Sequence, residues 1–134
     1  MPSETFLFIK PDAVKRNLIG EIIKRIENAG FKIKALKMKE MSTKETKRFY
    51  GIHKGKSFFG ELVKSIANKP IVGMILKKEN AVRDLREFIG ATDPRKAKKG
   101  SIRADFGLDV TRNSVHASDS PQNAKIELNL FFKR

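Results

Sequence analysis

Short apolar runs with the length of β-strands recur along the chain. Residues 5–10 (TFLFIK) and 71–76 (IVGMIL) are two such runs, and residues 114–117 form a shorter one. Runs of this kind between turn residues predict buried strands, and residues 5–10 are expected in the centre of a sheet. Residues 31–41 instead alternate between apolar residues and lysines. This alternation predicts a strand with one solvated face and a bulge or bend where the phase slips at Ala35-Leu36.

Other segments carry the spacing and end signals of helices. Apolar residues recur at helical spacing over residues 13–29, Ser42-Thr43-Lys44-Glu45 has the form of a capping box, and Ser120-Pro121 is a helix start. Gly90 is a stop signal. These features predict five helices, over residues 13–29, 42–50, 58–67, 80–89 and 124–132.

The order of these elements favours an α/β (α+β) fold of the ferredoxin-like βαββαβ type. We expect residues 1–134 to form one domain, a four-stranded antiparallel sheet with helices packed largely on one face and an inserted helical hairpin at residues 42–67. Residues 91–112 show no regular pattern. A loop of this length is usually functional.

Composition narrows the chemistry. Of the 134 residues, 40% are hydrophobic, which is enough for a core, and none is cysteine. A disulfide scaffold, a thiolate metal site and a cysteine nucleophile are therefore excluded. The apolar run at residues 6–9 is too short for a signal peptide or a membrane span, so a cytoplasmic protein without a membrane partner is expected.

The charge is strongly positive. Lysine and arginine total 29 and aspartate and glutamate 15, for a formal net charge of +14. Such a surplus attracts nucleic acids, anionic membranes and free nucleotides alike, so charge alone does not choose among them. The lysines at 32, 34, 37 and 39 and the basic run 95–99 are read as solvated faces, with a specific nucleic-acid footprint as the alternative.

The most informative segment surrounds His116. Strand alternation places His116 on one face with Ser114 and Ser118, just before a helix start whose backbone N–H groups favour anions. Glu127 shares the core-facing stripe of the last predicted helix and needs a partner there. It could orient the imidazole and leave the other ring nitrogen free to attack. A structural His–Glu hydrogen bond is the alternative that the composition favours.

Further candidates are basic or aromatic. Arg86 and Arg103 flank the long loop, which contains Thr92, and paired guanidinium groups suit phosphoryl transfer. A solvent-exposed helix arginine is the alternative for Arg86, and a simple edge lysine is the alternative for Lys10, which ends a predicted strand. The helical hairpin contains an aromatic cluster that could stack on a base. Core packing is the alternative role for this cluster. The cluster comprises Tyr50, His53 and Phe58.

Taken together, these segments resemble the nucleoside diphosphate kinase family over the whole chain. The most specific motif, N-x-x-H-[GA]-S-D-S, is met at residues 113–120. Four others are F-x-x-I-K-P-D-A-V-x-R at 6–16, Y-x-x-H followed by F-F at 50–59, G-A-T-D-P at 90–94 and G-S-I-R-x-D-F at 100–106. The chain departs from the family at Lys56 and Ser57, where arginine and proline are common.

The resemblance implies a ping-pong transfer of the γ-phosphate of a nucleoside triphosphate to a nucleoside diphosphate. His116 would be the nucleophile through Nδ1, forming phosphohistidine, while Glu127 and Ser118 would hold the ring by its other nitrogen. The remaining implied site residues bind the nucleotide. Phosphates and the transition state would be held by Arg86, Arg103, Thr92, Tyr50 and His53, the sugar by Lys10 and Asn113, and the base by Phe58 and Val110, with Lys10 and Tyr50 also assisting catalysis.

The resemblance also implies partners. Mg²⁺ would arrive bridged by the nucleotide phosphates, so no protein metal ligands are expected. Stacking does not read base edges, so broad base tolerance is expected. A homo-oligomer is implied, with a hexamer favoured over a tetramer, because Pro94 lies in the loop that the family's hexamers use between subunits.

Overall fold

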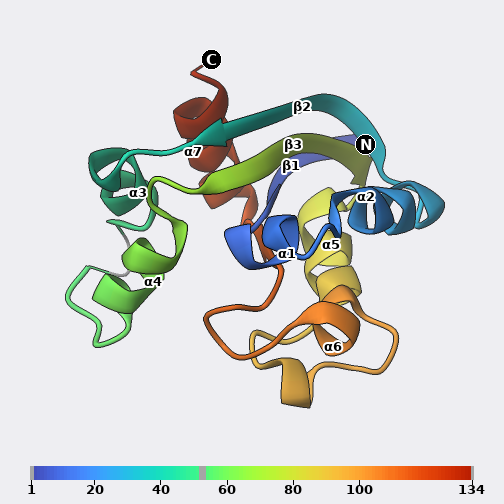
Figure 1. Cartoon of the computed structure of the whole chain (residues 1–134). Coiled ribbons are helices and arrows are strands. Elements are labelled where there is room, and N and C mark those ends of the chain that lie inside the picture. The colour runs from blue at the N-terminus through green and yellow to red at the C-terminus, as the bar shows by residue number, and fades with distance from the viewer. Residues whose placement is uncertain (1, 52–53, 134) are drawn as a thin grey trace.

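The computed structural model describes residues 2–51 and 54–133 as a single antiparallel sheet surrounded by helices (Figure 1). The strand order is β2-β3-β1-β4, and each neighbouring pair is antiparallel. The strands are β1 (Pro2–Ile9), β2 (Lys32–Glu40), β3 (Pro70–Glu79) and β4 (Val115–Ala117). The ferredoxin-like arrangement and the interior position of the first strand are therefore confirmed.

The helices follow the strands in the expected order. They are α1 (Pro11–Lys15), α2 (Ile19–Asn28), α3 (Thr43–Phe49), α4 (Phe59–Ile66), α5 (Ala81–Ile89), α6 (Ile102–Phe106) and α7 (Pro121–Phe132). Their caps agree with the sequence signals: Ser42 and Glu45 form a capping box, the Ser120 hydroxyl accepts from the Asn123 amide, and Gly90 ends α5 with a φ of 94°.

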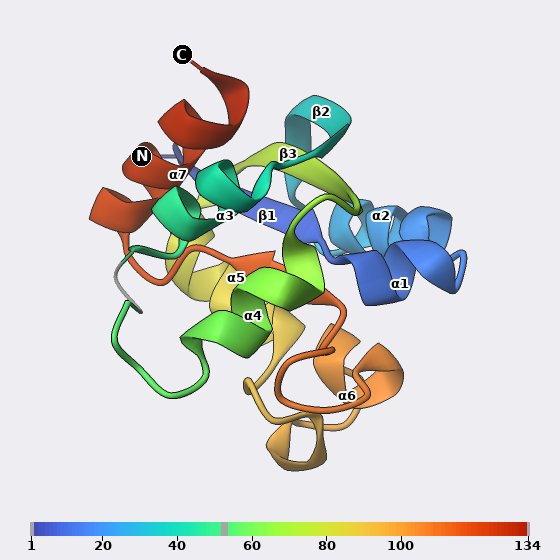
Figure 2. The ribbon, with the colours of Figure 1, turned by 60° about the vertical axis from the view of Figure 1, so that its left-hand side comes forward.

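Helices cover both faces of the sheet, and the expectation that they lie largely on one face is wrong. In β1, Leu7 and Ile9 pack on one side against α1, α2, α5 and α6, while Phe6 and Phe8 pack on the other against α3, α4 and α7. Figure 2 shows α3 beside α7, apart from α1 and α2. The inserted hairpin supplies the second cover, because its apolar stripe must also be buried.

The predicted helix over residues 13–29 is two helices. Between α1 and α2 the chain turns at Asn17, which has a φ of 61°. Asparagine tolerates this left-handed conformation better than most residues. Apolar periodicity does not reveal the break, because Ala13, Ile22 and Ile26 all face the same core on either side of it.

The region 91–112 is more regular than its sequence pattern indicates. It contains a 3-10 turn at Pro94–Lys96 and helix α6, each opened by a side-chain cap. Asp93 accepts from the Arg95 amide and Ser101 from the Ala104 amide. Elements of three to five residues are too short for a periodic signal, so only their caps could have shown them.

The bulge in β2 is confirmed, since the pairing of β2 with β3 shifts between Ile33 and Ala35. The lysine face is only partly solvated. Lys39 is largely covered: its Nζ donates to the Phe131 carbonyl at 3.0 Å and lies 4.6 Å from the centre of that residue's ring.

Helix α7 packs closely on β3. The ring of Phe131 occupies the space that a side chain at Gly73 would need, so glycine there permits the close approach. This contact anchors the helix that carries Glu127. Among the described residues, no helix is long and apolar enough to cross a membrane.

Candidate active site

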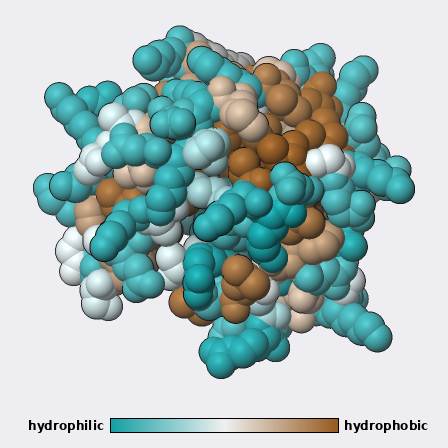
Figure 3. Space-filling model, viewed as in Figure 1, coloured by the Kyte–Doolittle hydropathy of each residue, from teal (hydrophilic) through white to brown (hydrophobic). Residues whose placement is uncertain are grey.

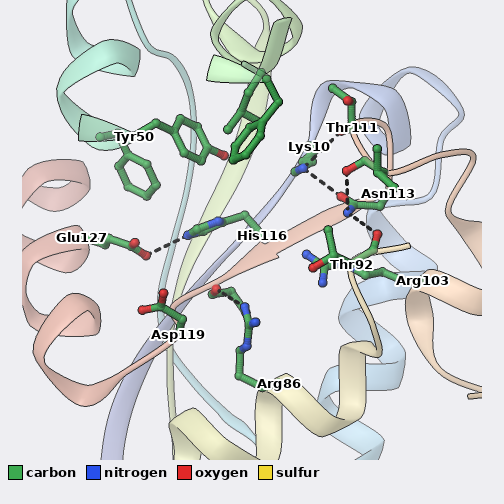
Figure 4. Close-up of a pocket in the computed structure, with 15 residues that line it drawn as sticks. Lys10, Tyr50, Arg86, Thr92, Arg103, Thr111, Asn113, His116, Asp119 and Glu127 are labelled. Carbon is green, nitrogen blue, oxygen red and sulfur yellow. Dashed lines mark hydrogen bonds and ion pairs between the residues drawn. The ribbon is translucent and has the colours of Figure 1, made fainter. Parts of the chain in front are cut away.

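A pocket of about 350 Å³ opens where β1 ends and β4 begins, between the helical hairpin and the segment that follows α5 (Figure 4). It brings together residues separated by more than one hundred positions in the chain. The expected site residues that line it are Lys10, Tyr50, Phe58, Arg86, Thr92, Arg103, Val110, Asn113, His116 and Glu127. His53 lies outside the described residues.

His116 is oriented by a carboxylate. Its Nε2 lies 2.8 Å from Glu127 Oε1, and the Ser118 hydroxyl donates to the same oxygen at 2.6 Å. The imidazole side chain is 17% exposed and that of Glu127 is 9% exposed. With the carboxylate accepting at Nε2, the imidazole tautomer that keeps its lone pair on Nδ1 is favoured. The predicted His116–Glu127–Ser118 contact is confirmed, and Nδ1 is not engaged by Glu127.

Aromatic rings from β1 and from the end of α3 pack around the imidazole. The ring of Phe8, which pairs with His116 across β1 and β4, stacks at 5.0 Å between centroids, and Phe49 and Tyr50 contact it edge-on at 5.2 and 5.7 Å. Sequence reasoning missed Phe8 and Phe49. Pairing of Phe8 with His116 depends on strand register, which only the assembled sheet shows.

Two arginines face the histidine from the opposite wall (Figure 4). Arg86, on α5, donates to the Ala117 carbonyl at 3.1 Å. Arg103, on α6, is 5% exposed and donates to the carbonyls of Gly90 at 3.2 Å and Val115 at 2.9 Å. Its Nε is buried without a hydrogen-bond partner among the described residues. Arg86 is exposed to solvent, as the alternative interpretation expects, but it also lines the pocket and therefore forms part of the candidate site.

Burial dominates the electrostatics of the pocket cations. It lowers the pKa of Arg103 to about 10, with Arg86 adding to the effect, and the group stays charged at neutral pH. Burial, and then the charge of Arg103, lowers the pKa of Lys10 to about 8, against the opposing influence of Asp12 and Asp109. Burial also raises the pKa of the Tyr50 hydroxyl, which therefore remains protonated.

Lys10 and Asn113 form one unit at the far end of the pocket. The Lys10 amine, 5% exposed, donates to Asn113 Oδ1 at 2.8 Å and to the Thr111 carbonyl at 3.2 Å. The Asn113 amide donates to the carbonyls of Thr92 at 2.9 Å and Val110 at 3.2 Å. Lys10 is thus integrated into the site and is not a simple edge lysine.

Apolar side chains stand at the pocket mouth. Phe58 is 45% exposed and Val110 is 53% exposed, and both line the pocket. The Lys56 amine lies 5.8 Å from the centre of the Phe58 ring. Asp119, which the sequence analysis did not place in the site, also lines the pocket and accepts a hydrogen bond from the side-chain Nδ2 of Asn123. Among the described residues no group of three potential metal-binding side chains occurs.

A histidine fixed by a carboxylate and faced by two arginines and a lysine is a site for phosphate-bearing ligands, and its scaffold is a ferredoxin-like sandwich. The family model described as nucleoside diphosphate kinase matches residues 3–134. The chain belongs to the nucleoside diphosphate kinase family. It is an enzyme that transfers phosphate between nucleoside triphosphates and nucleoside diphosphates.

Individual relatives agree over nearly the full length. The nucleoside diphosphate kinase of Histophilus somni (strain 2336) is 50% identical over 129 residues, which cover 96% of this chain and 92% of the relative. The crystal structure of the Aquifex aeolicus nucleoside diphosphate kinase superposes with a TM-score of 0.95 at 40% identity, covering 98% of this chain and 96% of that one. The Halobacterium salinarum enzyme, solved in complex with CDP, superposes with a TM-score of 0.95 at 35% identity, covering 100% and 90%.

Proposed function

We propose that phosphate passes through His116 in a ping-pong cycle. Nδ1 attacks the γ-phosphorus of a nucleoside triphosphate, the N–P bond forms, and the bond to the β–γ bridging oxygen breaks with its electron pair leaving on the nucleoside diphosphate. A terminal oxygen of a second nucleoside diphosphate then attacks the phosphohistidine and restores the imidazole. The orientation of the ring by Glu127, with the arginines opposite, is the observation that carries this proposal.

Glu127 and Ser118 prepare the ring for both half-reactions. A carboxylate accepting at Nε2 keeps the proton there and the lone pair on Nδ1, and it stabilises the positive charge of the ring once it is phosphorylated. Ser118 donates to the same oxygen, which keeps the carboxylate in position.

The arginines neutralise the phosphates. Arg103 is preorganised by two backbone carbonyls. Its Nε, which has no hydrogen-bond partner within residues 2–51 and 54–133, and its remaining N–H groups can therefore stabilise charge that develops in the transition state. Arg86 would hold the same phosphates from α5, with Thr92, Tyr50 and His53 as further contacts. Lys10 and Asn113, joined at the far end of the pocket, would hold the sugar, and the Lys10 charge also assists transfer.

The donor set of the pocket fits Mg²⁺ that arrives on the nucleotide. The pocket wall carries several cationic side chains and two carboxylates, Asp119 and Glu127. Such a wall suits Mg²⁺ that is held mainly by phosphate oxygens of the nucleotide and not by a cage of protein ligands. When bound, Mg²⁺ neutralises charge on the bridging and terminal phosphate oxygens. Removal of Mg²⁺ with a chelator should stop transfer, and transfer that continued would show this assignment to be wrong.

The apolar side chains at the pocket mouth support broad tolerance for the nucleotide base. Phe58 and Val110 present apolar surface, and stacking on such a surface is similar for every base. Purine and pyrimidine nucleoside diphosphates should therefore compete for the same phosphoenzyme. Exclusive use of one base would contradict this mechanism of tolerance.

Phosphorylation of the protein tests the proposed cycle directly. Incubation with a γ-labelled nucleoside triphosphate and Mg²⁺, without an acceptor, should label each chain once. The adduct should be acid-labile and alkali-stable, as expected for phosphohistidine. Addition of an unlabelled nucleoside diphosphate should remove the label as nucleoside triphosphate. Direct transfer with no labelled protein would overturn the ping-pong scheme.

The pKa of Lys10 predicts proton uptake on binding. With a pKa of about 8, the amine is charged in about half of the free molecules at pH 8, and nearby phosphates favour the charged form. Nucleoside diphosphate binding should therefore take up as much as about half a proton per site at pH 8 and little at pH 6. The affinity should fall as the pH rises above 8. Calorimetry in two buffers of different ionisation enthalpy measures the uptake, and Lys10→Met should remove it. Equal uptake in that variant would assign the proton to another group.

A homo-oligomer is the proposed assembly, as a hexamer or else a tetramer. Strand β2 lies at one end of the sheet and exposes Leu36 and Met38, which are 48% and 54% exposed. Figure 3 shows apolar surface in the region of β2, bordered by hydrophilic side chains. Apolar area of this kind is typical of an interface. Sedimentation at micromolar concentration should show more than one chain per particle.

The net charge of +14 supports a second, weaker property. It would draw anionic nucleotides toward the pocket, and it would also hold nucleic acid without sequence preference. The encounter rate with nucleotides and any nucleic-acid binding should both fall as salt is added. Rates independent of ionic strength would remove the steering role.

A further inference from the structure

Two side chains outside the pocket form hydrogen bonds with the segment 106–114, which contributes residues to the pocket lining. Asp12 in α1 and Arg16, the residue after the end of this helix, form an ion pair at 3.1 Å, and neither lines the pocket. Arg16 also donates to the Phe106 carbonyl at 2.7 Å, and Asp12 accepts from the Ser114 amide at 3.1 Å. Phe106 and Ser114 are the two ends of the segment that presents Val110, Thr111 and Asn113 to the pocket (Figure 4). The pair therefore joins both ends of this segment to one short helix.

Ser114 has a backbone conformation that a residue with a side chain rarely adopts. Its φ is 79°, and the Val115 amide donates to the Asn113 carbonyl at 3.0 Å, which closes a three-residue turn around it. A tight turn with this φ is rare and strained. It persists only where surrounding contacts determine it, and such positions cluster at functional sites.

Every polar group of Ser114 is held by residues of the β1–α1 junction. Its amide donates to Asp12, its carbonyl accepts from the Lys10 amide at 2.9 Å, and its hydroxyl accepts from Arg16 at 3.3 Å. The residue is fully buried. The turn thus lies between Asn113, whose side chain bonds Lys10, and the strand that carries His116.

We propose that Asp12 and Arg16 are positioning residues for nucleotide binding, which hold Ser114 in its left-handed turn and thereby place Asn113 and Lys10 against the sugar. The proposal rests on the sugar contacts assigned to Lys10 and Asn113 above. Without Asp12 the Ser114 amide loses its acceptor and Arg16 loses its anionic partner. The turn can then relax, and relaxation moves Asn113 before it affects Glu127 or the arginines.

The decisive comparison separates backbone strain from the loss of a contact. In Asp12→Ala, the KM for a nucleoside diphosphate should rise by roughly tenfold to a hundredfold, the range in which displacements of about 1 Å act, while the yield of phosphohistidine changes little. Adding Ser114→Gly should restore much of the affinity, because glycine adopts positive φ without steric cost. Adding Ser114→Ala, which also removes the hydroxyl but keeps Cβ, should not.

The control is Glu21→Ala, which removes an ion pair of the same spacing, Glu21 with Arg25 on α2, and should leave KM unchanged. A KM in Asp12→Ala within about twofold of the original would overturn the proposal, as would equal rescue by glycine and alanine. If Asp12→Ala unfolds, Arg16→Lys gives the same comparison, because lysine cannot bond Asp12, Phe106 and Ser114 together. Failure of the original protein to form phosphohistidine, or an unchanged KM in Asn113→Ala, would instead count against the proposed function.

Discussion

Replacing His116 by alanine should abolish both labelling of the protein and phosphate transfer between nucleotides. The substitution removes the one protein atom that bonds phosphorus in the proposed cycle, and neither Glu127 nor the arginines can replace it. The fold should survive, because His116 contributes a partly exposed ring to one short edge strand. Labelling with a γ-labelled nucleoside triphosphate, with the thermal unfolding midpoint as a check on folding, measures the result.

The second histidine provides the matched control. The chain has two histidines, so His53→Ala should still form the acid-labile adduct even if nucleotide binding weakens. An adduct that survives in His116→Ala and disappears in His53→Ala would move the nucleophile to the other histidine. Transfer in His116→Ala at the original rate would refute covalent catalysis by this residue.

Replacing Arg103 by alanine should lower kcat by about 10²- to 10³-fold, the cost of losing one preorganised donor to a transition state. Arg103 is buried, positively charged and held by the carbonyls of Gly90 and Val115, so it needs no reorganisation when charge develops. Single-turnover phosphorylation of His116 measures the chemical step separately from binding.

Two further variants distinguish catalysis from folding. Arg103→Lys keeps a charge but loses the planar donor set, so most of the loss should remain. Arg83→Ala removes another arginine from the same side of the fold, one whose side chain is 67% exposed and pairs with Asp84, and should leave kcat unchanged. A kcat for Arg103→Ala within about threefold of the original would reduce Arg103 to a structural contact, since the loss of such a donor costs far more.

The parts of the fold that sequence predicted well are those with strong local signals. The capping box at Ser42 and the helix start at Ser120 appear where expected, because each depends on neighbours in the chain. The strand predicted at residues 5–10 is also present, but it spans Pro2–Ile9. Local periodicity failed where the signal is short or ambiguous. Apolar periodicity predicted one helix where the structure has α1 and α2, because a single left-handed residue, Asn17, does not change the pattern. It also missed α6, because a five-residue helix is too short to produce a periodic pattern.

The site divides in the same way. The sequence by itself determined which residue types are available, the pairing of His116 with Glu127 by strand and helix periodicity, and the family to which the motifs belong. The tertiary structure decided that α5 and α6 direct Arg86 and Arg103 toward that histidine, that Phe8 stacks on it, and that Asp12 reaches Ser114. These contacts join residues 13 to 108 positions apart, and their geometry depends on strand register and helix packing, which no local pattern encodes.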